Sequence, residues 1–185
     1  MRIIGGWARS RRLAAPAGDA TRPTADRVRE AIFSILGPPP EGARVLDLFA
    51  GAGGMGLEAL SRGAAGAVFV DRAPAAVKCL RANIAALDVG DIAEVLPIDA
   101  IRAVNQLGRG EHRFDWVFID PPYDTELAAA ALAALAGGAL LGTEPAIVVE
   151  HDRRRELPET TGVLRRTDPR IYGDTAVSFY GRVAA

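Results

Sequence analysis

The chain has 185 residues, of which 49% are hydrophobic and one is cysteine, and its formal net charge at pH 7 is −1. This length fits one domain that buries about 70% of its unfolded surface, and the single cysteine, Cys79, excludes an internal disulfide and a cysteine-cluster metal site. The N-terminus lacks the apolar core of a signal peptide and the longest uncharged stretch is too short to span a membrane, so we expect a cytoplasmic protein with no membrane contact and no metal.

The charge is unevenly distributed along the chain. Residues 1–29 contain seven arginines and two acidic residues, a net charge of +5, so the remainder carries −6. A basic segment on an acidic body indicates a polyanionic partner; a solvated segment without a partner is the alternative. Within this segment, Arg2–Gly6 and Arg11–Ala14 are candidates for a small β-hairpin.

A helix is predicted over residues 24–36. Val28, Ile32, Ile35 and Leu36 form its apolar side, Thr24 is a suitable N-cap, and residues 37–40, Gly-Pro-Pro-Pro, end it. We therefore divide the chain into a basic N-terminal extension over residues 1–23 and a domain over residues 24–185 that includes this leading helix.

From residue 43 onward, strand-like and helix-like segments alternate. The predicted strands are Arg44–Phe49, Ala67–Asp71, Glu94–Ile98, Phe114–Ile119 and Pro145–Glu150, and the predicted helices are Gly54–Arg62, Pro74–Leu87, Ala100–Leu107 and Thr125–Ala136. This alternation is typical of an α/β, Rossmann-like fold with helices on both faces of a mostly parallel sheet, here of seven strands. Val163–Thr167 and Thr175–Arg182 have no helix between them, which predicts an antiparallel C-terminal hairpin at one sheet edge.

The segment Val45–Gly54 runs from a strand through a glycine-rich turn into a helix. Glycines let the backbone approach a ligand closely, and the helix N-terminus adds positive potential. Asp71 ends the next strand, 20 residues beyond Gly51, where a carboxylate can accept both hydroxyls of a ribose. These features predict a site for a nucleoside-bearing cofactor; for Asp71 alone, capping of the following helix is the alternative.

The identity of this cofactor depends on Asp47. Gly51–Gly56 satisfies the dinucleotide pattern Gly-x-Gly-x-x-Gly, which keeps NAD as an alternative. A carboxylate beside the passage from strand to loop would repel a pyrophosphate. It suits a positively charged ligand, such as the ammonium and sulfonium of S-adenosylmethionine, and the motif Asp-x-Phe-x-Gly-x-Gly over residues 47–53 favours methyl transfer.

The four residues Asp120-Pro121-Pro122-Tyr123 follow the strand Phe114–Ile119. The two prolines stop the strand and leave a stiff corner at its carboxyl end, where open α/β sheets place their ligands. The Asp120 carboxylate and the Pro121 carbonyl can accept the two hydrogens of a flat amine, and the Tyr123 ring can stack on its base. A plain turn, with the Tyr123 ring packed beneath the loop, is the alternative.

These motifs carry a resemblance to a known family. In order and spacing, Asp47–Gly53, Asp71, Asp99 and Asp120–Tyr123 resemble the class I S-adenosylmethionine-dependent methyltransferases that act on exocyclic amines. More narrowly, Arg22–Phe33, Arg2–Gly6 and Leu57–Ala64 resemble the bacterial RsmD family, and the resemblance spans nearly the whole chain. It implies a monomeric enzyme that methylates a guanine N2 of small-subunit ribosomal RNA.

The resemblance also implies roles for individual residues. The cofactor-binding set is Asp47, Phe49, Gly51, Gly53, Asp71, Arg72, Asp99 and Ala100, and the catalytic set is Asp120, Pro121, Pro122 and Tyr123. Within the first set, Asp47 and the Gly51–Gly53 backbone would hold the methionine part of the cofactor and Asp71 its ribose. Asp99 and the Ala100 amide would contact the adenine, although Asp99 could instead cap the helix that begins at Ala100.

A base in a duplex cannot enter such a pocket, so the target must be unpaired or flipped out. The arginines expected to contact RNA phosphates are Arg9, Arg11, Arg12, Arg22, Arg27 and Arg29, although Arg22 and Arg29 could instead brace the floor of the active site. The small size of the chain favours an assembled or partly assembled 30S particle as the substrate. A DNA adenine-N6 methyltransferase, a NAD-dependent oxidoreductase and a non-catalytic nucleotide-binding module remain the alternatives.

Overall fold

The computed structural model describes residues 1–16, 23–122 and 126–183. Its helices are α1 (Pro23–Leu36), α2 (Gly54–Ser61), α3 (Pro74–Leu87), the 3₁₀ turn η1 (Gly90–Ile92), α4 (Ala100–Leu107) and α5 (Leu127–Leu135). Its strands are β1 (Arg44–Leu48), β2 (Gly66–Val70), β3 (Ala93–Leu96), β4 (Phe114–Ile119), β5 (Leu141–Asp152), β6 (Thr160–Thr161), β7 (Leu164–Tyr172) and β8 (Thr175–Arg182). No helix in these ranges is long and apolar enough to cross a membrane.

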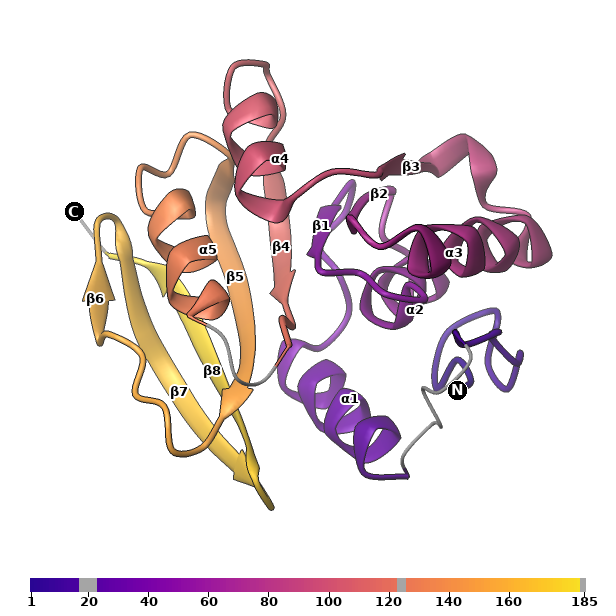
Figure 1. Cartoon of the computed structure of the whole chain (residues 1–185), viewed down its shortest axis with the longest axis horizontal. Helices are drawn as coiled ribbons and strands as arrows, with labels where there is room; N and C mark the ends of the chain where they lie inside the picture. Colours follow the sequence, from indigo (N-terminus) through magenta and orange to yellow (C-terminus); the bar gives the residue numbers. More distant parts are fainter. Residues whose placement is uncertain (17–22, 123–125, 184–185) are drawn as a thin grey trace.

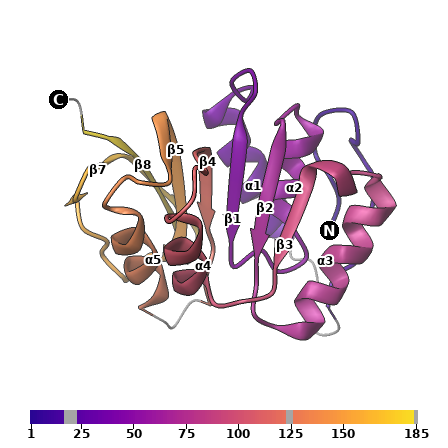
Figure 2. The same ribbon diagram turned by 90° about the horizontal axis from the view of Figure 1, so that it is seen from above.

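All strands belong to one sheet, in the order β3-β2-β1-β4-β5-β8-β7-β6 (Figures 1 and 2). The five strands from β3 to β5 pair in parallel, and β8, β7 and β6 add antiparallel strands at one edge. Such an arrangement of parallel strands and crossover helices is the α/β, Rossmann-like fold that the sequence predicts.

The sheet separates two apolar layers. On one face, α1, α2 and α3 contribute residues such as Phe33, Leu57 and Leu80 to a cluster with β-strand residues that include Phe118. On the other face, α4 and α5 pack against alternate residues of the same strands, for example Ile119. Burial on both faces explains why β1 and β4 are almost continuously apolar.

The N-terminal segment forms a small hairpin outside the main sheet. Arg2 and Arg12 make an isolated antiparallel bridge, and the Ile3 N–H donates to the Arg11 carbonyl at 2.9 Å. The hairpin lies beside α2 and α3 (Figure 1). This pairing agrees with the hairpin that the sequence suggests.

The antiparallel edge differs most from the sequence prediction. The sheet has eight strands instead of seven, because Thr160 and Thr161 pair with the start of β7. The strand β7 continues through Pro169, where the sequence indicates a turn. The pairing of β7 with β8 shifts register between Arg166 and Asp168, just before Pro169. The strand β6 pairs only with the start of β7 and does not reach Pro169. On the β6 side, therefore, the missing N–H of this proline leaves no acceptor unsatisfied.

Other boundaries deviate less. The helix α1 begins at Pro23 and not at residue 24, and the proposed capping side chain of Thr24 lies outside what the structure describes. The strand β5 extends four residues before Pro145, with a register shift against β4 between Phe114 and Trp116. Strand β4 and helices α3 and α4 have the predicted bounds.

Candidate active site

Acidic side chains gather at the carboxyl ends of four neighbouring strands. In the sheet order β2, β1, β4 and β5, they are Asp71, Asp47, Asp120 and Glu150. In the parallel pairing of β4 with β5, Ile119 lies beside Val149, so the next residues, Asp120 and Glu150, are neighbours. The sheet therefore brings together carboxylates that are far apart in the sequence.

The loop between β1 and α2 has a strained backbone that opens toward this edge. Phe49 has a φ of 62°, which is rare for a bulky residue, and Gly51 and Gly53 have φ values of 54° and 90°. A Cβ at Gly51 would meet no described atom within 4 Å, whereas a Cβ at Gly53 would lie 2.6 Å from Leu80 Cδ1. The loop thus offers its backbone to a ligand at Gly51, and Gly53 is needed for packing.

Asp47 lies beneath this loop and is 2% exposed. Its Oδ2 accepts the Gly56 N–H at 2.8 Å, and a Cβ at Gly56 would come within 3.1 Å of the same oxygen. Burial raises the pKa of Asp47 to about 7; the Gly56 hydrogen bond opposes this and repulsion from Asp71 adds to it. Among the described residues, Asp47 forms no ion pair, so a positively charged ligand would stabilise its ionised form.

Asp71 binds two backbone groups. Its Oδ2 accepts the Gly51 N–H at 2.8 Å, and its Oδ1 accepts the Ala73 N–H at 2.8 Å just before α3. The carboxylate therefore fixes the glycine loop and the turn before α3. The N-cap of α3 is Ala73, so Asp71 does not take the capping role considered as the alternative. Because each carboxylate oxygen has two lone pairs, both can still accept a ligand hydroxyl.

Asp99 is the N-cap of α4, the alternative that the sequence analysis named. Its Oδ1 accepts the N–H of Ile101 at 2.9 Å and of Arg102 at 3.3 Å. Its Oδ2 lies 3.9 Å from a guanidinium nitrogen of Arg72, whose side chain is largely exposed. Ala100 is the first residue of α4, where backbone N–H groups have no partner within the helix. A cofactor role for these residues stays a prediction.

Asp120 follows the last residue of β4 and is exposed to solvent, whereas Pro121 is buried and Pro122 exposed. Surrounding protein desolvates the carboxyl group, and this effect, followed by repulsion from Glu150 and Asp47, raises the pKa of Asp120 well above its ordinary value. Tyr123, the last predicted residue of the catalytic set, lies outside the described residues.

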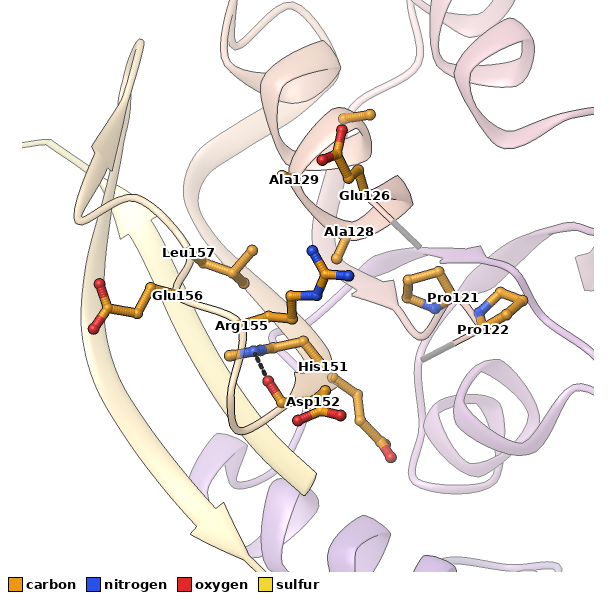
Figure 3. Close-up of a pocket in the computed structure, with 12 residues that line it drawn as sticks. Pro121, Pro122, Glu126, Ala128, Ala129, His151, Asp152, Arg155, Glu156 and Leu157 are labelled. Carbon is orange, nitrogen blue, oxygen red and sulfur yellow. Dashed lines mark hydrogen bonds between the residues drawn. The ribbon is translucent and has the colours of Figure 1, made fainter. Parts of the chain in front are cut away.

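A cavity of about 390 Å³ adjoins this corner (Figure 3). Its walls are Pro121 and Pro122, the first turns of α5, the end of β5 and the turn after it. In Figure 3, the guanidinium of Arg155 points between α5 and the two prolines. The imidazole of His151 closes one wall and binds Ser178 Oγ at 3.0 Å. The cavity has the size of a small-molecule pocket.

The arginines predicted to contact RNA fall into two groups. Arg9, Arg11, Arg12 and Arg27 are exposed, and Arg9 and Arg27 line an open cavity of about 420 Å³ between the hairpin and α1. Arg22 lies outside the described residues.

The phosphate contact predicted for Arg29 disagrees with the structure. Arg29 is 5% exposed. It donates to the Arg2 carbonyl at 2.6 Å and to Asp26 Oδ1 at 3.0 Å, and its Nε lies 3.7 Å from Glu58 Oε2. Its neighbours surround it, so Arg29 braces the hairpin and α1 against α2, in line with the bracing alternative.

Buried polar side chains that the sequence analysis did not single out attach the hairpin to the domain. Glu58 is fully buried, and its carboxylate accepts the N–H groups of Ile4 and Gly5, each at 2.8 Å. Asn83 donates to the carbonyls of Ala14 and Ala52 at 3.0 and 2.9 Å. The only signal in the sequence was a polar residue within an apolar helical face, which does not reveal its partner.

Comparison with known proteins places these features in a wider group. Residues 1–181 match a family model described as conserved hypothetical protein 95. The chain is 44% identical to "Putative rRNA methyltransferase YlbH" of Bacillus subtilis, over 97% of this chain and 98% of that protein. It is 38% identical to "Ribosomal RNA small subunit methyltransferase D" of Escherichia coli, over 100% and 91% of the two chains.

A solved structure gives the same result for the fold. "Putative methyltransferase yhhF from Escherichia coli" superimposes with a TM-score of 0.86 at 36% identity and covers 100% of this chain and 99% of that one. The agreement includes the N-terminal hairpin and the antiparallel edge, because almost no residue of either chain is left unmatched.

The raised pKa of Asp47 predicts a pH-dependent stability cost. Its folded-state pKa of about 7 exceeds the ordinary value of 3.8. Between these two values, the native chain holds a proton that the unfolded chain has released. The free energy of unfolding therefore falls as pH rises from about 4 to about 7. Asp47→Asn removes this titration and keeps an acceptor for the Gly56 N–H. Between pH 4 and pH 8 the variant should gain up to about 4 kcal/mol relative to the wild type, measured by urea unfolding. If the free energies of unfolding of Asp47→Asn and the wild type changed with pH in parallel, this assignment would be contradicted.

The buried carboxylate of Glu58 predicts a large stability loss on truncation. Glu58→Ala leaves two backbone N–H groups and the Nε–H of Arg62 without their acceptor and removes the ion pair with Arg29. We expect a loss of about 3–5 kcal/mol in urea unfolding. Glu58→Gln retains one acceptor oxygen and should lose less. Hydrogen exchange of the Ile4 and Gly5 amides should accelerate in both variants. Unchanged exchange at these two amides would show that Glu58 does not hold the hairpin.

Proposed function

Because the chain belongs to the conserved hypothetical protein 95 family, the RsmD family of ribosomal RNA methyltransferases, we propose that it transfers a methyl group from S-adenosylmethionine to the exocyclic N2 of a guanine in small-subunit ribosomal RNA. The observation that carries this proposal is the position of Asp120. It follows β4 at a proline corner, one strand away from the open glycine loop after β1. A hydrogen-bond acceptor for an amine and the open glycine loop thus lie at the ends of neighbouring strands.

The residues present suit this cofactor. Asp47 is a buried carboxylate without an ion-pair partner in the described ranges, which complements a ligand with positive charge. The loop is open at Gly51, where a ligand can contact the backbone, and Asp71 has lone pairs left for ribose hydroxyls. S-adenosylmethionine, when bound, supplies an electrophilic methyl group on a positively charged sulfur.

Asp120 and Pro121 would orient the acceptor amine. The lone pair of an exocyclic amine is delocalised into the ring, so the nitrogen is a weak nucleophile. If the Asp120 carboxylate and the Pro121 carbonyl accept its two hydrogens, the nitrogen becomes more pyramidal and its lone pair points out of the ring plane. Positioning of this kind contributes as much as about 7–11 kcal/mol to catalysis, and the carboxylate also complements the positive charge that develops on nitrogen.

The exposed arginines suit an RNA partner. Arg9, Arg11, Arg12 and Arg27 form a basic surface on the hairpin and α1, and arginine contacts to phosphates position a nucleic acid without reading its sequence. The target base must leave its stack to reach Asp120, and stacking on Tyr123 remains the expected support. We keep the expectation that the substrate is a 30S particle in the cytoplasm and that the enzyme acts as a monomer.

The alternatives fit the site less well. In a NAD-dependent oxidoreductase, the pyrophosphate would lie next to the glycine loop, where Asp47 would repel it. A non-catalytic binding module gives no reason for a carboxyl group at the proline corner, beside the end of β1. A DNA adenine-N6 methyltransferase shares the amine chemistry, and its separation from a guanine-N2 enzyme depends on other contacts with the base.

Substitution of Asp120 tests the catalytic assignment. Asp120→Ala removes the charged acceptor and should lower kcat by about 10²- to 10³-fold, the loss typical of one preorganised transition-state contact. Asp120→Asn keeps one acceptor oxygen and should fall between that variant and the wild type. Both should bind S-adenosylmethionine with nearly wild-type Kd in calorimetry, because Asp120 contacts the acceptor amine. Asp174→Asn, a surface control, should be fully active. Full turnover by Asp120→Ala would contradict the assigned role.

The basic surface predicts a salt dependence of RNA binding. Four arginine–phosphate contacts with single-stranded RNA give a logarithmic salt slope of about −3, at about −0.7 per contact. Replacing Arg9, Arg11, Arg12 and Arg27 with Gln should make the slope of log K for small-subunit rRNA less negative by about this amount, measured by fluorescence anisotropy. Arg170→Gln on β7 is the control and should leave the slope unchanged. An unaltered slope in the fourfold variant would place the RNA elsewhere.

A further inference from the structure

Glu150 is an acidic side chain in the active site to which the sequence motifs give no role. It lies near the end of β5, beside Asp120, since the two follow the paired residues Ile119 and Val149. Its negative charge is one of the causes that raise the pKa of Asp120. It also lines the cavity next to Pro121 and Pro122. Glu150 therefore lies beside Asp120 and lines the cavity.

Arg155 continues this row of polar groups. It lines the same cavity and is exposed, and its guanidinium points between α5 and the two prolines (Figure 3). Among the lining residues it is the only arginine or lysine. The other basic side chain there, His151, has a pKa lowered by burial, which outweighs its backbone hydrogen bonds. The corner after β4 and the cavity beside it thus hold two hydrogen-bond acceptors, Asp120 and Glu150, and one donor, Arg155.

Two acceptors and one donor are the groups that complement one edge of guanine. That edge presents the N2 amine and N1–H as donors and O6 as an acceptor, whereas adenine presents a donor amine at N6 and an unprotonated acceptor at N1. Resting on the proposed guanine-N2 activity, we propose that Glu150 selects the base by accepting the guanine N1–H while Asp120 accepts a hydrogen of N2. The donor of Arg155 then faces O6.

Glu150 would also reject adenine. With the adenine N6 amine at Asp120, the N1 lone pair would face the Glu150 carboxylate, and two acceptors would be brought together without a hydrogen. A site built to bind a substrate N–H discriminates strongly against an analogue that lacks it, because the acceptor, half-buried here, is left unpaired. A carboxylate offers about four acceptor positions, so it can bind a base N–H in addition to other donors. Glu150 thus supplies the discrimination that the Asp-Pro-Pro-Tyr motif lacks.

The test replaces the target base and Glu150 together. Small subunits are reconstituted with rRNA that carries guanine or 2-aminopurine at the target position. 2-Aminopurine keeps the reacting amine but has an unprotonated N1 and no O6. The wild-type enzyme should prefer guanine in kcat/KM. Glu150→Gln loses the charge-assisted hydrogen bond to guanine, and its amide N–H can donate to N1 of 2-aminopurine, so the guanine preference should fall by about 10- to 100-fold.

A matched variant and two further readouts separate the possible causes. Glu144→Gln, on the exposed amino end of the same strand, should keep the wild-type preference. Thermal unfolding and S-adenosylmethionine binding of Glu150→Gln establish that the variant is folded and holds its cofactor. If Glu150 had only a structural role, Glu150→Gln would lower kcat/KM for the guanine and 2-aminopurine substrates equally and leave the preference unchanged.

The outcomes distinguish this inference from the proposed function. Transfer to guanine N2 with a preference that Glu150→Gln does not alter would overturn the role of Glu150 and leave the proposed function intact. Absence of any transfer to guanine N2 by the wild-type enzyme would overturn the proposed function, and the role of Glu150 with it. A collapse of the preference in Glu150→Gln alone would support base selection by Glu150.

Discussion

Repulsion among carboxylates at one edge of the sheet is the constraint on which the candidate site depends. Parallel strands bring Asp71, Asp47, Asp120 and Glu150 to neighbouring strand ends, and burial raises the pKa of Asp47 and Asp120. Part of the compensation is local, since N–H groups of the glycine loop and α2 bind Asp71 and Asp47. Under the proposed function, a cationic cofactor and the N–H donors of a base would complement the remaining negative charge. The property that weakens the fold at neutral pH would then also favour binding of the substrates.

The hairpin is attached to the same region through buried polar groups as well as through the apolar side chains of Ile3, Ala8 and Leu13. Asn83 links the two directly, because its amide binds Ala14 of the N-terminal segment and the Ala52 carbonyl of the glycine loop. Glu58 and Arg29 add contacts between the hairpin, α1 and α2. The proposed RNA-contacting surface is thus held in a fixed position relative to the glycine loop.

Local patterns predicted the parts of the molecule that local interactions determine. The strand before Asp120, the glycine loop and the amphipathic helix α3 have the predicted positions because proline, glycine and apolar spacing act within a few residues. Features set by distant partners were missed. The pairing of β4 with β5 places Glu150 beside Asp120, the packing of α1 on α2 buries Arg29, and the uncovered edge of β7 tolerates Pro169. None of these partners can be read from sequence spacing.

The most direct test of the account is radiolabelled methyl transfer from S-adenosylmethionine to small ribosomal subunits, free small-subunit rRNA and duplex DNA, followed by digestion to nucleosides. The account predicts label in N2-methylguanosine from small subunits, with less from free rRNA and none from DNA. Label in N6-methyladenine would keep the amine chemistry and contradict guanine as the target. Absence of label from every substrate would contradict methyl transfer itself.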